Sequence, residues 1–135
     1  TLLMTTSEIT NQNKALVVEI EGIRNSKGYI LLAIYASADG FPDVSEKAII
    51  RKRIPAQAGN MSISIDNLKP GKYAFGVVHD ENDNQKLDTG LFGIPKEGFC
   101  FSRQAMGTFG PPDFKDAQFE FQPGKVLQKV KLSYW

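Results

Sequence analysis

The residues of this chain best suited to chemistry are oxygen-bearing side chains that alternate along one polar stretch after an apolar run. Asp80, Asn82 and Asn84 are each two residues apart, and Asp88 follows after a gap. Calcium takes about six to eight oxygen ligands, and a tight loop can supply them from every second residue. On the calcium-loop template these three residues take positions 1, 3 and 5, the backbone carbonyl of Lys86 takes position 7, and Asp88 takes position 9. The spacing predicts a divalent-cation site, with calcium as the expected ion.

The match to that template is incomplete at two positions. Position 6 usually needs glycine for a left-handed backbone, and here it is Gln85; that conformation costs a non-glycine residue about 1–2 kcal/mol. Position 12 is usually a bidentate glutamate, and here it is Leu91. We therefore expect weak binding, with a dissociation constant of about 10⁻⁴–10⁻³ M, and further oxygens from water or from other acidic residues. The acidic candidates that follow are Glu97, Asp113 and Asp116.

Other interpretations of these residues need no metal. Asn and Asp favour turns because their side chains bond to the nearby backbone, so residues 80–88 also fit a solvated turn. The carboxylate of Glu97 also fits a role as acceptor for backbone amides of the long loop. For His79, the only histidine, orienting the loop through a hydrogen bond is a better interpretation than acid–base chemistry.

Composition excludes several classes of protein. The chain has 135 residues, with 16 basic and 15 acidic side chains and a net charge of +1. This balance gives no basic surplus for nucleic acid or for an anionic membrane, and no apolar run reaches the roughly eighteen residues of a membrane-spanning helix. The single cysteine, Cys100, excludes an internal disulfide and a multi-cysteine zinc site. Because it lies between two phenylalanines, we expect a buried and unreactive thiol.

The first fourteen residues differ in pattern from the rest. They begin with the apolar residues Leu2, Leu3 and Met4 and then become polar and irregular. We expect a flexible N-terminal segment at 1–14 and a single domain at 15–135. The apolar fragment fits the remainder of a removed signal segment, so we expect an exported protein, whether periplasmic, on the cell surface or secreted.

From residue 15 onward the hydrophobic pattern repeats every two residues, which is the period of β-strands. The almost continuous apolar run 29–35 is expected at the centre of a sheet, and the charged stretch 48–54 at an edge. The long interruption at 80–116 is expected to be an ordered, functional loop region. The pattern predicts an all-β antiparallel sandwich of about seven strands. The expected strands are 16–21, 29–35, 48–54, 61–65, 73–78, 119–121 and 126–132.

Two stretches of the chain resemble known families. Residues 66–75, DNLKPGKYAF, have the L-x-P-G-x-Y form of transthyretin-like and immunoglobulin-like modules, in which Tyr73 would fill a core position and bond to nearby backbone. The run 79–102, HDENDNQKLDTGLFGIPKEGFCFS, resembles the bacterial domain-of-unknown-function family 2141. The resemblance extends over roughly residues 15–134 and includes the segments 38–42, 107–112 and 114–119.

The resemblance implies a small exported bacterial β-sandwich, immunoglobulin-like or transthyretin-like, without an established biochemical activity. The chain keeps the polar positions of that family at Asp80, Asn82, Asp88 and Glu97. It has Gln85 where the family usually has glycine.

Three classes of function fit these observations. The first is a non-catalytic, calcium-stabilised module that binds an unknown protein or glycan through the loop end of the sandwich. The second is a hydrolase acting on glycans through a carboxylate pair, drawn from Asp80, Glu97, Asp113 and Asp116. Hydroxyisourate hydrolases of the transthyretin-like class need several histidines, so one histidine excludes that activity. The third class is a purely structural module. We favour the first and expect no catalytic activity.

Aromatic residues are frequent in and beside the long loop. We expect them to form a small core of their own, packed over the end of the sandwich, in preference to a platform for stacking a ligand. These residues are Phe92, Phe99, Phe101, Phe109 and Phe114.

Overall fold

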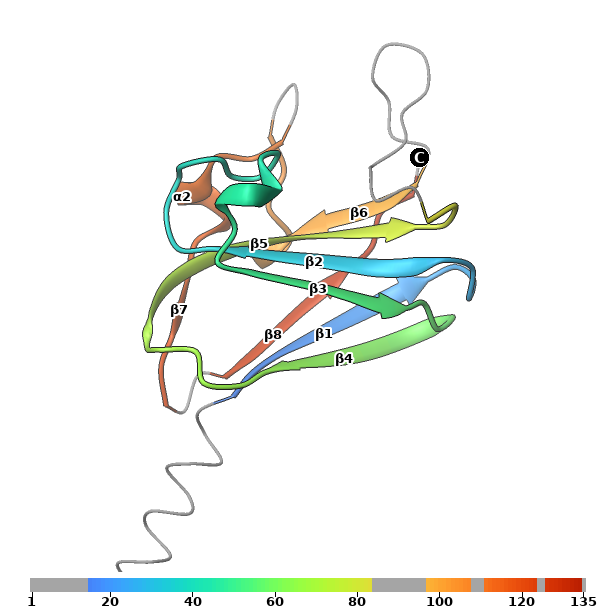
Figure 1. The fold of residues 1–135 in the computed structure, drawn as a ribbon, viewed down its shortest axis with the longest axis horizontal. Helices are drawn as coiled ribbons and strands as arrows, with labels where there is room; N and C mark the ends of the chain where they lie inside the picture. Colours follow the sequence, from blue (N-terminus) through green and yellow to red (C-terminus); the bar gives the residue numbers. More distant parts are fainter. Residues whose placement is uncertain (1–14, 84–96, 108–110, 124–125, 135) are drawn as a thin grey trace, which may run out of the picture.

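The chain folds into a sandwich of two β-sheets (Figure 1). The computed structural model describes residues 15–83, 97–107, 111–123 and 126–134. The three-stranded sheet has the order β4–β1–β8, and the five-stranded sheet has the order β3–β2–β5–β6, with β7 paired to the start of β5. The strands are β1 (Leu16–Ile23), β2 (Tyr29–Tyr35), β3 (Ile50–Pro55), β4 (Gly59–Ile65), β5 (Gly71–Asp80), β6 (Gly98–Phe101), β7 (Phe119–Phe121) and β8 (Leu127–Lys131). The short helices are η1 (Ser45–Lys47), η3 (Ser102–Gln104) and α2 (Phe114–Ala117).

The two-residue hydrophobic period explains why the sheets pack face to face. Side chains alternate between the two faces of a strand, so one face of each sheet is apolar throughout. Ile30, Leu32 and Ile34 of β2 point into the core, and so do Phe75 and Val77 of β5. Burying a side chain of this size stabilises the fold by about 1.5–3 kcal/mol before entropy is counted. The all-β sandwich predicted from the sequence is confirmed, with eight strands among the described residues.

Two features of the topology differ from the sequence-based expectation. Strand β6 lies inside the stretch 80–116, where no strand was expected. It is only four residues long, Gly-Phe-Cys-Phe. Polar and apolar residues do not alternate along it, because both of its faces are covered. In addition, β1 and β8 pair in parallel. They come from opposite ends of the chain, so no hairpin turn forces them to be antiparallel.

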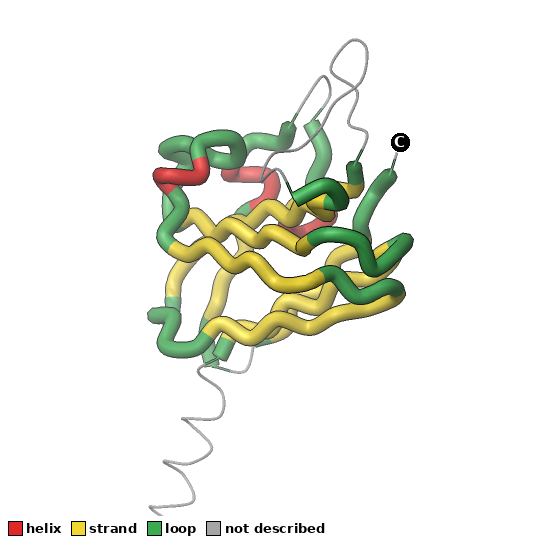
Figure 2. The backbone as a smooth tube through the Cα atoms, turned by 45° about the vertical axis from the view of Figure 1, so that its right-hand side comes forward, coloured by secondary structure: helices red, strands yellow, loops and turns green. Residues whose placement is uncertain are grey.

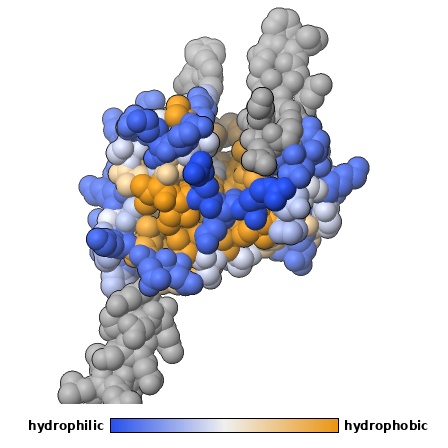
Figure 3. Space-filling view, in the orientation of Figure 1, coloured by the Kyte–Doolittle hydropathy of each residue, from blue (hydrophilic) through white to orange (hydrophobic). Residues whose placement is uncertain are grey.

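Strand β3 is confirmed as an edge strand. Its residues Arg51, Lys52 and Arg53 are all exposed and lie between the partly buried Ile50 and Ile54. Figure 3 shows hydrophobic surface in the middle of this view, interrupted by a band of hydrophilic side chains. Charged side chains on an edge strand discourage unwanted pairing with another sheet.

The L-x-P-G-x-Y motif joins β4 to β5. Leu68 is buried, and the Tyr73 hydroxyl donates to the carbonyl of Lys69 at 2.6 Å. Asn67 has φ 63°, a left-handed conformation that Asn tolerates better than most residues. The predicted bond from this tyrosine to nearby backbone is confirmed.

A cluster of aromatic side chains lies on the outer face of the five-stranded sheet, outside the core between the sheets. Phe41 makes edge-to-face contacts with Tyr35, Phe101 and Phe114, with ring centroids 5.3, 6.2 and 5.8 Å apart. Phe99 packs against Phe101 at 6.0 Å. The predicted small core of the loop region is therefore present for Phe99, Phe101 and Phe114, whereas Phe92 and Phe109 lie outside the described residues.

Cys100 and the helices complete the fold. The thiol is 1% exposed, and burial raises the pKa of Cys100 to about 12, which fits the expected unreactive role. The helices are short and lie among the loops toward the upper end of the strand body in Figure 2. Among the described residues no helix is long and apolar enough to cross a membrane.

Candidate functional site

The candidate site lies where β5 ends and β6 begins. These strands pair antiparallel, with His79 opposite Gly98. Asp80 follows His79 and Glu97 precedes Gly98, so both acidic residues lie beside the last pair of this ladder. Both residues are buried, with 0% and 4% of their surface exposed. The structure thus brings together two of the predicted ligands from positions seventeen residues apart in the chain.

The remaining predicted ligands fall into two groups. Asn82 lies in the turn after β5 and is exposed. Asn84, Lys86 and Asp88 lie outside the described residues. Among the described residues no group of three or more His, Cys, Asp or Glu side chains is placed to hold a metal ion.

Hydrogen bonds order both sides of this turn. The carboxylate of Glu97 accepts a hydrogen bond from the backbone amide of Glu81 at 2.8 Å. This is the backbone contact expected for Glu97, and it ties the start of β6 to the end of β5. Asp83 donates its amide to the carbonyl of Asp80 at 3.4 Å and has φ 55°. The left-handed residue within the described turn is therefore Asp83, and Gln85 lies outside the described residues.

Asp113 and Asp116 are not part of this site, contrary to the expectation that they supply further oxygens. They flank Phe114 at α2, and Phe114 contacts Phe41 at the end of β2 that carries Tyr35. Asp80 pairs with Tyr29 at the other end of the same strand. Six residues of strand span about 20 Å. Asp113 and Asp116 therefore lie near the opposite end of the sheet from Asp80.

Two arginines engage the other carboxylates of the turn. Arg24 forms an ion pair with Glu81, whose carboxylate also accepts a hydrogen bond from the Asn25 side chain at 2.5 Å. The hydrogen bond from Arg24 holds the pKa of Glu81 below its usual range. Arg53 pairs with Asp83 at 2.6 Å. These two carboxylates are therefore each engaged by an arginine.

Arg53 is also held by an aromatic ring. Its guanidinium lies 3.5 Å from the centroid of Tyr29, a cation–π contact that fixes the side chain over the sheet. Because Tyr29 is the cross-strand partner of Asp80, this contact anchors one rim of the site.

His79 lies inside the sandwich, next to the site. It is fully buried, and its Nε2 donates to the carbonyl of Lys27 at 2.8 Å, because a carbonyl only accepts. The other ring nitrogen, Nδ1, then accepts from the Tyr134 hydroxyl at 2.7 Å. That hydroxyl accepts in turn from the Arg24 amide at 3.1 Å. Both ring nitrogens are used, and they tie His79 to the β1–β2 turn and to the C-terminal segment. That His79 orients the loop after β5 stays a prediction.

Gly28 brings the β1–β2 turn against this site. It has φ +64°, and a Cβ there would lie 2.0 Å from the carbonyl oxygen of Asp80. Only glycine fits this close approach. Arg24 and Lys27 belong to the same turn. The close approach therefore brings Arg24 within reach of Glu81 and the Lys27 carbonyl within reach of His79.

Sequence reasoning missed Arg24, Arg53 and Tyr134. They are distant from residue 80 in the chain, and Tyr134 contacts the Arg24 amide across 110 positions. No local spacing signals such pairs. The one usable signal was the excess of acidic residues in 80–83, which requires cations from elsewhere.

Comparison with known proteins gives one match. No curated protein and no solved structure matches the chain. A family model described as an uncharacterized protein conserved in bacteria, DUF2141, matches residues 18–129, which is most of the chain. The chain therefore belongs to the DUF2141 family of bacterial proteins.

Proposed function

We propose that this chain is a non-catalytic module of an exported bacterial protein that binds calcium in the 80–88 loop together with Glu97. The observation that carries the proposal is that two acidic residues, Asp80 and Glu97, are both buried beside His79 and Gly98, the last paired residues of β5 and β6. Like charges on paired strands destabilise the pair when they lie close together. A divalent cation between them turns this repulsion into attraction.

The other charged groups of the turn support this assignment. Glu81 and Asp83 already have arginine partners. These arginines hold Glu81 and Asp83, and the proposed cation binds the other two acidic residues of this end of the sheet, Asp80 and Glu97. Alternating oxygen side chains from Asp80 onward supply the remaining ligands on the calcium-loop template.

The side chains with nucleophilic or acid–base potential support a non-catalytic role. Both ring nitrogens of His79 are engaged in structural hydrogen bonds. Burial keeps the Cys100 thiol protonated, with its pKa raised to about 12, and the thiolate is the reactive form. Bound calcium would instead order the loop, because metal affinity and local folding are coupled. The ordered loop end would then present a surface to a protein or a glycan.

Thermal unfolding in a calcium titration tests the proposal. We expect the melting temperature to rise with millimolar calcium and to return to its starting value with a chelator. Asp80→Asn removes one charge from the pair and should weaken calcium binding at least tenfold. Asp66→Asn changes an exposed aspartate in the β4–β5 turn and should leave the response unchanged. Equal responses from the two variants, or no response of the unaltered chain, would contradict the proposal.

A further inference from the structure

Strand β8 forms one edge of the three-stranded sheet. The backbone N–H and C=O groups of its even-numbered residues point toward β1. The Val126 carbonyl accepts from the Val17 amide at 2.8 Å, and the Leu132 amide donates to the Glu21 carbonyl at 3.0 Å. Backbone groups of successive strand residues point to opposite edges. The odd-numbered residues of β8 therefore direct their N–H and C=O groups away from β1.

One of these outward positions is already paired. The side-chain amide of Gln104 bonds to both backbone groups of Lys131, accepting from its N–H at 2.8 Å and donating to its C=O at 2.7 Å. It imitates the backbone of a neighbouring strand. Leu127 and Lys129 have no such partner among the described residues. Within the part of the chain that the structure describes, the edge is thus closed at Lys131 and open at Leu127 and Lys129.

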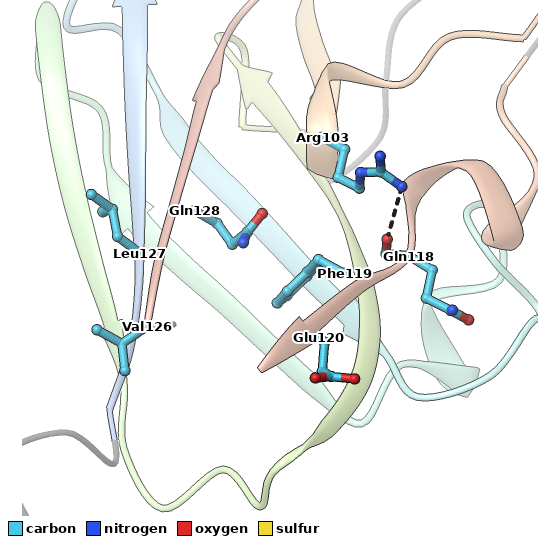
Figure 4. A pocket seen from close by; sticks show the side chains of 7 residues that line it. All are labelled: Arg103, Gln118, Phe119, Glu120, Val126, Leu127 and Gln128. Carbon is cyan, nitrogen blue, oxygen red and sulfur yellow. Dashed lines mark hydrogen bonds between the residues drawn. The ribbon is translucent and has the colours of Figure 1, made fainter. Parts of the chain in front are cut away.

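A hollow of about 570 Å³ lies beside the open part of the edge, between β7 and β8. Figure 4 shows the Phe119 ring and the Gln128 amide directed toward this gap from the two strands, whereas Leu127 points outward. Phe119 is 6% exposed and forms an apolar floor, and Leu127 is 53% exposed. The lining residues are Arg103, Gln118, Phe119, Glu120, Val126, Leu127 and Gln128.

The charged side chains along the edge of β8 indicate which kind of partner can bind there. Lys131 is exposed on β8, and Arg103 lies at the upper rim of the hollow. Lys129 is also exposed and pairs with Glu21 at 3.3 Å, and Glu120 is the acidic residue of the lining, so the basic side chains of this edge outnumber the acidic ones. A second copy of this strand would place lysines close to lysines, which destabilises a strand pair. An acidic strand would meet opposite charges instead.

We propose that the open edge of β8 binds an extended acidic peptide by strand addition, with one apolar side chain of the peptide placed in the hollow. The backbone of Leu127 and Lys129 offers donors and acceptors that repeat every two residues, about 6.8 Å. An extended peptide matches this repeat, and main-chain bonds then give affinity while the pocket gives selectivity. The proposal is independent of calcium, because β7, which lines the hollow, pairs with residues Gly71 to Tyr73 at the start of β5, whereas Asp80 is the last residue of that strand.

Fluorescence anisotropy with a labelled hexapeptide of alternating valine and glutamate tests the proposal. We expect saturable binding to the full chain. Two matched probes should each bind at least tenfold more weakly: one N-methylated at alternate backbone amides, and one with lysine in place of glutamate. No saturable binding up to millimolar concentration would overturn strand addition, as would equal binding of the N-methylated probe. Equal binding of the lysine probe would overturn the acidic selectivity.

A pair of variants locates the bound strand. Leu127→Pro removes the outward N–H without removing a bond to β1, and proline is tolerated on strand edges. Leu127→Ala keeps that N–H and is the matched control. We expect at least tenfold weaker binding for the proline variant and less than a threefold change for the alanine variant.

Amide hydrogen exchange of the unaltered chain gives a second measurement, which does not depend on the folding of a variant. Adding the valine–glutamate probe should slow exchange at Leu127 and Lys129. Unchanged exchange at both amides under saturating probe would overturn the proposed location.

Discussion

Gly28 is the residue on which the geometry of the loop end depends most closely. A side chain there meets the Asp80 carbonyl oxygen at 2.0 Å and the Glu81 carbonyl oxygen at 2.7 Å. Gly28→Ala should therefore lower the free energy of unfolding by more than the roughly 1–2 kcal/mol that a left-handed conformation costs an alanine. The additional loss is expected because the β1–β2 turn and the turn after β5 must also move apart. Urea denaturation measures this loss.

Gly59 provides the matched control for that substitution. It also has a positive φ, +98°, but a Cβ there meets nothing within 4 Å. Gly59→Ala should be less destabilising than Gly28→Ala. Equal losses from the two variants would show that the contact with Asp80 is unimportant.

The ion pair of Glu81 and Arg24 gives a pH-dependent contribution to stability. The hydrogen bond from Arg24 lowers the pKa of Glu81 in the folded chain. A carboxyl with a lowered folded pKa stabilises the fold above its unfolded pKa, and this contribution is lost as the pH falls through the folded value. Glu81→Gln should thus lower the free energy of unfolding at about pH 7 but change it little at about pH 2.

Urea unfolding at both pH values checks this prediction. Glu120→Gln, at an exposed glutamate outside the ion pairs of the described residues, is the control. A pH-independent loss for Glu81→Gln would mean that its contribution does not come from the charged form.

At the scale of elements, Ser102 holds the point where β5 changes partner. β5 pairs with β7 up to Tyr73 and with β6 from Gly76 onward. Between them the Phe75 amide donates to Ser102 Oγ at 3.0 Å, and Oγ donates to the Ala117 carbonyl at 2.6 Å. The side chain thus replaces the strand bond that the change of partner removes.

Ser102→Ala should be strongly destabilising, because it leaves a buried donor and a buried acceptor unpaired. Such groups cost about 1–3 kcal/mol each, so we expect the free energy of unfolding to fall by about 2–6 kcal/mol. Ser62→Ala on the exposed side of β4 should change stability by less than about 0.5 kcal/mol. Chemical denaturation of both variants decides whether Ser102 has this role.

Local alternation predicted most strands because the core needs one apolar face on each. Met61 to Ile65 is an example, found within β4. Strand β6 was missed because Phe99 and Cys100 are both buried, one on each face of the sheet. A strand covered on both sides carries no period to detect.

At the scale of the whole molecule, the loop end of the sandwich gathers groups from the whole length of the chain. Arg24, Glu81 and Tyr134 meet there, with the Arg24 guanidinium 4.4 Å from the Tyr134 ring centroid. The sequence indicated the acidic members of this end through their spacing. It did not indicate the arginines or the tyrosine, because only the folded topology brings them close.

The calcium proposal depends on the two buried acidic residues Asp80 and Glu97. Diffraction from a crystal soaked in calcium, compared with one soaked in a chelator, tests it most directly. We predict a calcium difference peak bonded to the side-chain oxygens of both Asp80 and Glu97, at about 2.3–2.6 Å. Two soaks without a difference peak between these side chains would contradict the account.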